Sequence, residues 1–399
     1  MKLEPPWEIT KIEFNQDKGS INVRVDFPKG SVFLCPKCGG EVKAYDTTEK
    51  RFRHLNFFQY ACYMVVRVPR INCPCDGIIQ IDLPWARAGA DFTLLFESFA
   101  MALVREMPVN KVSKIIGVDD NKLWRMMWYY VKEARRLEDY SEVDKIGVDE
   151  TSKTKGHDYV SLFADLTGKR TIFVAEGKGA DTIAAFAQDL KEHKGDPEHV
   201  TDVSMDMSPA FISGVEANLP KATITFDKYH IMKLINTAVD EVRKTETREQ
   251  NILRGQKYLF LKNRANLTDL QLKSLQIIES MSKLNLKTVK AYHIRENFQE
   301  IYKEATKERF EKSLKKWYFW ATHSRIFEMI DAARMIKHHW AGVLRWYESK
   351  INNGILEGLN SLVQAAKAKA RGYRTFKNLK TIIYLLTGKL NYSRVGLPI

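Results

Sequence analysis

KIGVDE (145–150), YVSLFADL (159–166) and RTIFVAEG (170–177) follow one another in the middle of this 399-residue chain. Short polar turns join the three apolar runs, which predicts a meander of three strands. The pattern then alternates between helix and strand. TIAAFAQDLKEHK (182–194) and PAFISGVEANL (209–219) have helical spacing, whereas HVTDVSMD (199–206) and ATITFD (222–227) are strand-like. Alternation of this kind predicts parallel strands joined by helical crossovers.

A meander followed by parallel crossovers describes a ribonuclease-H-like core, which we assign to residues 141–244. Residues 245–345 are rich in Lys, Glu, Leu and aromatic residues and show no strand pattern, so they predict an all-α insertion. Residues 346–399 return to the core with the amphipathic helix ILEGLNSLVQAAKAKAR (355–371). The predicted fold class is therefore multidomain α/β.

Three acidic residues are candidates for a catalytic site. Strands one and four lie side by side in a ribonuclease-H-like sheet, so Asp149 and Asp206, at the ends of these strands, are expected to meet. In the helix at 355–371, Leu356, Leu359 and Val363 form an apolar stripe, and Glu357 lies on the adjacent polar edge. Glu357 is therefore expected to face the two aspartates.

Clustered carboxylates repel each other unless cations neutralise them, and oxygen ligands suit Mg²⁺ or Mn²⁺. Two such ions support phosphoryl transfer, and here Asp149 would bridge both while Asp206 and Glu357 each hold one. The alternative is that an aspartate at a strand end only forms a turn or caps a helix. Nearby acidic residues could also be mistaken for the catalytic ones: Asp144, Glu150, Asp202, Asp227 and Glu348.

Residues 1–88 alternate apolar and polar residues between Gly-containing turns, which predicts short strands. A CxxC pair is followed by a second cysteine pair about 35 residues later, a spacing typical of a tetrahedral zinc ribbon. The predicted structural zinc ligands are Cys35, Cys38, Cys73 and Cys75. Because the second pair is spaced CPC, Cys62 or His54 could replace one of them. The alternative is four reduced structural thiols.

Residues 89–140 contain two helices separated by GVDD, the outline of a helix-turn-helix. The net charge of +14 indicates a polyanionic partner, because Lys and Arg neutralise phosphates. The second helix begins near Asn121, and it presents Asn121, Lys122 and Arg125 where bases are read.

Further cations and aromatic residues occur beside the predicted catalytic residues. Phosphate contacts are expected from Lys367, Arg371, Tyr373, Arg374 and Lys377, unless this is only a solvated helix end. In the insertion, Trp320 is a candidate for stacking on an unpaired base, with core packing as the alternative. His230 follows the fifth strand and is a candidate for the active site, with a structural histidine as the alternative.

The cellular location of the protein can be predicted from its apolar segments, its first residues and its cysteines. The sequence has no apolar run of membrane-spanning length, and its start lacks the apolar region of a secretory signal. Five cysteines, four of them in close pairs, fit metal binding in a reducing compartment. We therefore expect a cytoplasmic protein.

Several long motifs occur in order along the chain. They are CPKCGG with RFRHL and PRINCPC, then GVDETS, MDMSPAF, FDKYHIMKLINTAVDEVR, YLFLKNRANLT and NNGILEGLNSLVQAAKAKARGYRTFKNL. Over essentially its whole length the chain resembles a transposase of the insertion-sequence family named IS-L-three. The resemblance implies a zinc-binding domain, a helix-turn-helix and a DDE catalytic domain with a helical insertion. Its acidic triad corresponds to Asp149, Asp206 and Glu357, whereas the CPC spacing departs from the usual ribbon.

This resemblance implies an enzyme that binds the terminal inverted repeats of an insertion sequence, cleaves double-stranded DNA and joins it to a target. Pairing of two ends predicts a homodimer or a larger synaptic assembly, acting at the nucleoid of a prokaryote. Two rival functions remain at this point. A ribonuclease-H-like nuclease without strand transfer would share the triad, and a catalytically silent DNA-binding regulator would share only the DNA-reading modules.

Overall fold

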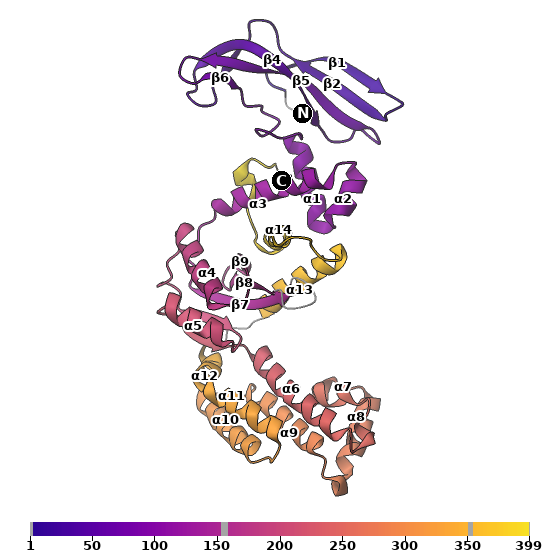
Figure 1. Ribbon diagram of the computed structural model, residues 1–399, viewed down its shortest axis with the longest axis vertical. Helices are drawn as coiled ribbons and strands as arrows, with labels where there is room; N and C mark the ends of the chain where they lie inside the picture. The colour runs from indigo at the N-terminus through magenta and orange to yellow at the C-terminus, as the bar shows by residue number, and fades with distance from the viewer. Residues whose placement is uncertain (1–2, 153–158, 350–353, 399) are drawn as a thin grey trace. The chain divides into compact units, whose positions relative to one another are not determined.

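The structure is a computed structural model that describes residues 3–152, 159–349 and 354–398. The chain forms two compact units, each with its own sheet (Figure 1). The first unit contains Met1–Glu138, Ala366–Arg371 and Lys389–Ile399, and the second contains Asp139–Ala365 and Gly372–Gly388. We had predicted that residues 346–399 belong to the core. Instead, Lys389–Ile399 group with the first unit, where Arg394 Nη1 donates a hydrogen bond of 3.5 Å to the Leu137 carbonyl.

The first unit begins with a six-stranded sheet. Its order is β1-β2-β5-β4-β3, and β6 pairs with β5. Short strands were predicted here, but β4 and β5 each extend over 13 residues. β5 is long because it pairs with β2, β4 and β6, and because buried side chains such as Met64, Val66 and Val68 anchor it along its length. The strands are β1 (Glu8–Asn15), β2 (Ser20–Asp26), β3 (Val32–Leu34), β4 (Glu41–Arg53), β5 (Ala61–Cys73) and β6 (Gly77–Gln80).

In the described chain, three α-helices follow this sheet: α1 (Leu94–Glu106), α2 (Val109–Ile116) and α3 (Asp120–Arg136). The turn between α2 and α3 depends on two residues. Gly117 ends α2 with φ of 64°, a left-handed conformation that favours glycine, and the Asp119 side chain accepts a hydrogen bond from the Asn121 N–H to start α3. This tight turn between two helices confirms the outline predicted from GVDD.

The second unit contains a five-stranded sheet of order β11-β10-β7-β8-β9. β7, β8 and β9 form the antiparallel meander, whereas β10 and β11 run parallel to β7. All five strands were predicted, and the pairing of the first strand with the fourth is confirmed. The strands are β7 (Lys145–Ser152), β8 (Tyr159–Asp165), β9 (Arg170–Glu176), β10 (Asp202–Met205) and β11 (Thr223–Phe226).

The two faces of this sheet have different partners. Successive side chains of a strand point to opposite faces. Ile146 and Val148 of β7 join the core that contains α4 (Ala180–Glu192) and α5 (Pro209–Asn218). Gly147 instead faces α13 (Gly354–Ala370), because a Cβ at this position would lie 2.5 Å from Leu356 Cδ1. Asp149 has the same parity as Gly147, so it too faces α13.

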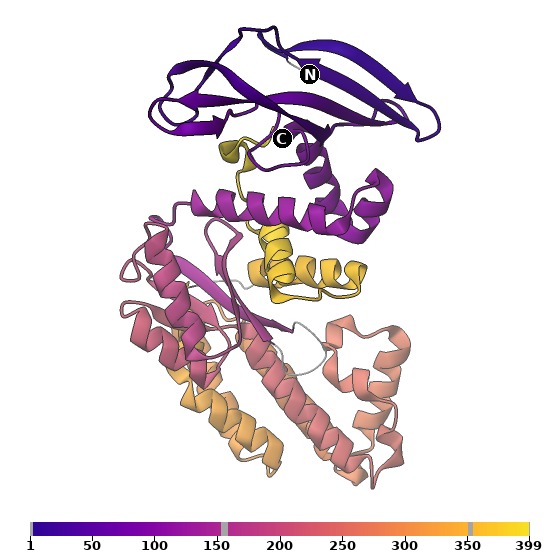
Figure 2. The same cartoon turned by 45° about the horizontal axis from the view of Figure 1, so that its top comes forward.

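The described part of the predicted insertion contains helices joined by turns and no strand. α6 packs against α9 and α11, and it is the long helix that leads from the sheet into the insertion (Figure 2). The Trp317 indole is buried and donates a hydrogen bond of 2.8 Å to the Ile294 carbonyl. The helices are α6 (Lys228–Glu246), α7 (Lys257–Leu261), α8 (Asp269–Ser280), α9 (Lys287–Ile301), α10 (Lys307–Thr322), α11 (Phe327–His338) and α12 (Trp340–Ser349).

A buried arginine ties the insertion together. Arg295 of α9 donates from Nε to Asn236 Oδ1 at 2.9 Å and from Nη2 to Asn263 Oδ1 at 2.6 Å. It also bonds to the carbonyls of Leu261 and Lys262. The YLFLKNRANLT motif is therefore held in place by Arg295.

After the insertion, α14 (Phe376–Thr387) packs on β9 at the edge of the sheet.

Candidate active site and metal centre

Asp149 and Asp206 belong to neighbouring strands of the second unit. Asp149 lies in β7, and Asp206 directly follows β10. Ser204 pairs with Gly147 in the parallel register of β10 and β7, so two more residues along each chain bring Asp206 opposite Asp149. Asp206 Oδ1 accepts a hydrogen bond of 2.9 Å from the Ser208 N–H, which fixes the carboxylate at the start of α5.

The electrostatics of this pair favour a bound cation. Burial raises the pKa of Asp149, and the negative charge of Asp206 raises it further. Burial also raises the pKa of Glu150, with a second contribution from Asp206. A positive neighbour stabilises the charged form of such buried carboxylates.

His230 lies in the first turn of α6, among these carboxylates. Its Nε2 is 3.8 Å from Asp149 Oδ1, and its Nδ1 is 3.4 Å from Asp227 Oδ2. Burial by itself would lower the pKa of His230, but Asp227 and Asp149 outweigh burial and the pKa is raised. The imidazole therefore tends to stay protonated beside Asp149.

α13 presents a polar edge to β7. Asn360 donates a hydrogen bond from Nδ2 to Asp149 Oδ2, and Gln364, one turn later, donates to Thr151 Oγ1. Asn360 Oδ1 is buried without a hydrogen-bond partner among the described residues. Sequence reasoning had given Asn360 no role.

Glu357 precedes Asn360 by three residues, so it lies on the same side of α13, one turn nearer the start of the helix. Its side chain is exposed. Among the described residues, the oxygens of Asp149, Asp206 and Glu357 do not form a group within 4.8 Å of one another. The structure thus brings the two aspartates together and carries Glu357 on the helix that contacts Asp149.

Four of the five other acidic residues near these strands have structural partners. Asp202 Oδ1 pairs with Arg345 Nη2 at 3.2 Å, and Glu348 pairs with Lys307 and Arg345. The remaining two lie at turns: Asp227 accepts a hydrogen bond of 3.1 Å from the Tyr229 N–H at the start of α6, and Asp144 accepts one of 3.4 Å from Thr167. Glu150 is the exception, since it is half-buried beside Asp149.

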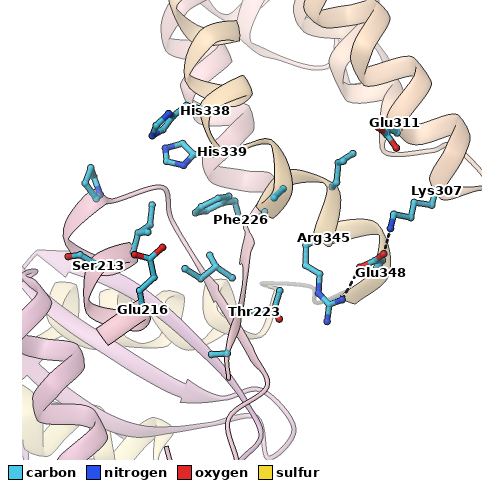
Figure 3. Close-up of a pocket in the computed structure, with 17 residues that line it drawn as sticks. Ser213, Glu216, Thr223, Phe226, Lys307, Glu311, His338, His339, Arg345 and Glu348 are labelled. Carbon is cyan, nitrogen blue, oxygen red and sulfur yellow. Dashed lines mark hydrogen bonds and ion pairs between the residues drawn. The ribbon is translucent and has the colours of Figure 1, made fainter. Parts of the chain in front are cut away.

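A separate pocket of about 1030 Å³ lies where α5 and β11 meet α10, α11 and α12 (Figure 3). Gly342 lets α12 lie close to β11, because a Cβ there would be 2.4 Å from the Phe226 ring. The ion pairs of Glu348 with Lys307 and Arg345 lie at one side of this pocket (Figure 3). None of the three predicted catalytic carboxylates lines it. The pocket is therefore distinct from the candidate active site.

In the first unit, one ligand atom each from Cys35, Cys38, Cys73 and Asp76 lies within 4.8 Å of the others. A backbone hydrogen bond at Gly40 lowers the pKa of Cys38, but the crowded thiols of Cys73 and Cys35 outweigh it and raise the pKa to about 11. Crowded thiols of this kind suit a metal ion that displaces their protons. Cys75, which we had predicted as a ligand, is exposed and does not belong to this group.

The two alternative ligands are also outside the cysteine group. Cys62 is buried near the start of β5, a strand that lies between β2 and β4. His54 Nδ1 lies 2.8 Å from Thr93 Oγ1, and burial lowers the pKa of this histidine. Neither residue therefore lies with the group of Cys35, Cys38 and Cys73.

The predicted base contacts in α3 and α10 lie at the surface of these helices. Asn121 and Arg125 are exposed near the start of α3, whereas Lys122 Nζ pairs with Asp91 Oδ2 at 2.7 Å. The side chain of Trp320 in α10 is 38% exposed, next to the exposed Phe319.

The basic segment at the end of α13 is partly buried. Burial lowers the pKa of Lys367 and raises that of Tyr373 to about 12. The remaining predicted contacts are exposed: Arg371, Arg374 and Lys377.

Comparison with known proteins decides the family. Residues 146–383, more than half of the chain, match a family described as "Transposase", of the ISL3 group. The chain belongs to the ISL3 transposase family. Residues 81–131 match the "Helix-turn-helix domain of transposase family ISL3", and residues 31–75 match the "zinc-finger of transposase IS204/IS1001/IS1096/IS1165". The predicted family, the helix-turn-helix and the zinc ribbon are thereby confirmed.

Two relatives match nearly the whole transposase. The transposase for insertion sequence element IS1001 of Bordetella parapertussis is 24% identical over 376 residues, covering 92% of this chain and 91% of the relative. The transposase for insertion sequence element IS1557 of Mycobacterium tuberculosis is 23% identical over 435 residues, covering 97% of this chain and 96% of the relative.

The chain is accordingly a DNA-binding transposase of the DDE type, an enzyme whose chemistry uses divalent metal ions. Its ribbon binds structural zinc. No described helix has the length and apolar character to cross a membrane.

Proposed function

We propose that this transposase has a ribonuclease-H-like catalytic core in which Asp149, Asp206 and Glu357 hold two Mg²⁺ or Mn²⁺ ions. The observation that carries the proposal is the parallel pairing of β7 with β10, which aligns Asp149 with Asp206 on the face that packs against α13. A sheet of order β11-β10-β7-β8-β9, with its meander followed by parallel strands, supports the ribonuclease-H-like assignment. Asn360 Oδ1 is buried without a hydrogen-bond partner among the described residues, while its Nδ2 contacts Asp149, which supports a metal there.

The proposed reaction consists of two in-line displacements on DNA. In the first, a water oxygen bonds to phosphorus at the element end, and the bond from phosphorus to the 3′ oxygen breaks, which frees a 3′-hydroxyl. In the second, that hydroxyl bonds to a target phosphorus while a target bond breaks. When bound, the two ions activate the attacking oxygen and stabilise the leaving one.

The chain's own residues prepare this site. Asn360 orients Asp149 through its hydrogen bond, and His230, whose Nε2 lies 3.8 Å from Asp149 Oδ1, offsets part of the carboxylate charge in its protonated form. We propose that Glu357 completes the site when metal and DNA bind, since it lies one turn from Asn360 on the same side of α13. Glu150, half-buried beside Asp149, is a structural neighbour in this proposal.

We further propose how the enzyme holds DNA. The ribbon, within residues 1–88, and the helix-turn-helix, within 89–140, recognise the terminal inverted repeats at the nucleoid. Asn121 and Arg125 contact bases, and Lys122 must first leave the exposed Asp91. The basic segment after Glu357 contacts phosphates, Trp320 stacks on an unpaired base, and two protomers or more hold the paired ends. The phosphate contacts are assigned to Lys367, Arg371, Tyr373, Arg374 and Lys377.

The test is strand transfer by the purified protein on DNA that carries the element ends, with Mg²⁺. Wild type is compared with Asp149→Ala, Asp206→Ala and Glu357→Ala, and Glu150→Ala is the matched control. Joined product should vanish in the three variants while end binding persists, and Glu150→Ala should retain activity. Undiminished activity in any of the three would show that the carboxylate is wrongly assigned.

Two outcomes would favour the rival functions. Cleavage without joining would favour a ribonuclease-H-like nuclease. Specific end binding without any cleavage by wild type would favour a DNA-binding regulator. Both rival functions would be recognised from the activity of the wild type, whereas a wrongly assigned carboxylate would be recognised from the activity of its variant.

A further inference from the structure

We propose that the fourth zinc ligand of the ribbon is the carboxylate of Asp76, and that Cys75 is an exposed thiol outside the metal site. The zinc site is then three thiolates and one carboxylate instead of four thiolates. The inference concerns the ribbon only and does not depend on the proposed catalytic triad.

Two pentapeptides of the sequence share the pattern CPxxG. CPKCG spans residues 35–39 and CPCDG spans residues 73–77. Aligned on their first cysteine and proline, the two segments put Asp76 at the position of Cys38, whereas Cys75 takes the position of Lys37. The closing glycines also match, because Gly39 has φ of 72° and Gly77 has φ of 69°.

A backbone hydrogen bond also closes each turn, at a spacing of four residues in the first and three in the second. The Gly39 N–H donates 2.9 Å to the Cys35 carbonyl, and the Asp76 N–H donates 3.3 Å to the Cys73 carbonyl. The first turn joins β3 to β4 and the second joins β5 to β6. Ala44 of β4 pairs with Ile71 of β5, so the antiparallel register brings both turns to the same end of the sheet.

Distances between the four ligand atoms fit a tetrahedron. Sulfur atoms bound tetrahedrally to zinc at about 2.3 Å lie about 3.8 Å from each other. Cys38 Sγ is 3.5 Å from Cys73 Sγ, and Cys35 Sγ is 3.9 Å from Asp76 Oδ2. The remaining separations within the group are no more than 4.8 Å. Asp76 therefore completes the ligand set without rearrangement of the backbone.

A neighbouring cation stabilises Asp76 in the role of ligand. Asp76 Oδ1 pairs with Lys37 Nζ at 3.2 Å, while Oδ2 faces the sulfur of Cys35. Carboxylates that bind zinc are commonly held by a further hydrogen bond from outside the ligand set. Lys37 provides that contact from the position that matches Cys75.

The other candidates for the fourth ligand are excluded by their positions. Cys62 and Cys73 are 11 residues apart on the same strand β5, which places them about 36 Å apart at the usual rise of a strand. His54 directly follows β4 at its far end, where Arg53 pairs with Tyr63. Cys75 is close in sequence, but its exposed side chain is not in the group formed by Cys35, Cys38 and Cys73.

The decisive experiment is alkylation of the intact, zinc-loaded wild-type chain with N-ethylmaleimide, followed by peptide mapping and measurement of bound zinc. We expect Cys75 to be modified while zinc is retained and Cys35, Cys38 and Cys73 stay protected. A chelator should then expose the three protected thiols. Protection of Cys75 together with the other three would overturn the proposal.

Variants provide a second measurement. In competition with a zinc chelator, Cys75→Ser should hold zinc within about twofold of wild type, whereas Asp76→Ala should weaken zinc at least about 100-fold. Asp76→Cys rebuilds the CxxCG sequence of the first knuckle and should retain zinc. With cobalt in place of zinc, its thiolate charge-transfer absorbance should exceed that of wild type by about one third, since four thiolates replace three. Loss of zinc in Cys75→Ser with retention in Asp76→Ala would refute the proposal.

Discussion

Gly147→Ala is the substitution that best tests how α13 is positioned. The added Cβ would lie 2.5 Å from Leu356 Cδ1, 2.9 Å from Leu356 Cγ and 2.9 Å from Leu166 Cδ2. Non-bonded carbons prefer separations of about 3.5–4.0 Å, so α13 or its side chains must move by about 1 Å. Gly147 is therefore the residue that lets α13 lie directly on β7.

The magnitude follows from the packing. Overpacking of a well-filled core costs about 1–3 kcal/mol, and we expect Gly147→Ala to lower the free energy of unfolding of the second unit by that amount. Displacement of a reacting group by about 1 Å can lower a rate about 100-fold. Because α13 carries Glu357, DNA cleavage should fall by about that factor while binding of the element ends is unchanged.

The assay combines urea unfolding with cleavage of end-bearing DNA for four proteins: wild type, Gly147→Ala, Leu356→Ala and the double variant. Leu356→Ala alone should cost about 2–5 kcal/mol, because it leaves a cavity. The double variant should cost less than the sum of the two singles by about 0.5–3 kcal/mol, since the smaller side chain makes room for the new Cβ. Gly358→Ala is the matched control. A Cβ at Gly358 meets nothing within 4 Å, so this variant should be neutral or stabilise the helix by up to about 1 kcal/mol.

Two results would refute this reasoning. Strict additivity of Gly147→Ala and Leu356→Ala would mean that the two residues do not compete for space. Full cleavage activity in a destabilised Gly147→Ala would mean that the position of α13 is not critical for the chemistry.

Two further predictions concern buried charges. Burial raises the pKa of Glu97 above 4.5, so the stability that this group contributes is present at low pH and is lost as the pH rises through its folded-state pKa. The melting temperature of Glu97→Gln, relative to that of wild type, should therefore increase as the pH rises. A difference in melting temperature that does not change with pH would contradict this prediction. Arg295→Met should cost at least about 3 kcal/mol in urea unfolding, because it leaves Asn236, Asn263 and two partly buried carbonyls without their donor. An Arg295→Met protein as stable as wild type would show that the arginine does not hold the insertion together.

Much of the catalytic unit could be predicted because its signals are local. The five strands from Lys145 to Phe226 are apolar runs of strand length separated by polar turns, and each run formed the predicted strand. The order of strands and helices then fixed which strands pair, so the meeting of Asp149 with Asp206 followed from the pattern alone. The apolar stripe of the helix at 355–371 similarly predicted that it packs on the sheet, and Leu356 and Leu359 are buried there.

At the zinc ribbon, the cysteine pattern and the tertiary structure point to different residues. Counting cysteines selected Cys75, because a thiol is the usual zinc ligand. In the structure the group contains Asp76 instead. The signal was present in the sequence, since CPCDG shares the pattern CPxxG with CPKCG, but only the turns and the antiparallel register of β4 and β5 show which side chains converge.

By itself, the sequence determined the elements of this protein, their order and the identity of its acidic and sulfur-containing groups. These properties depend on hydrophobic periodicity and turn residues, which act over a few neighbouring positions. The tertiary structure was needed to show that Asn360 donates a hydrogen bond to Asp149 and that Arg345 forms an ion pair with Asp202. It was also needed to show that the chain's last residues group with the first unit. Such contacts join residues more than 140 positions apart in the chain, as Asp202 and Arg345 are. They are set by the packing of whole elements, so no local pattern can specify them.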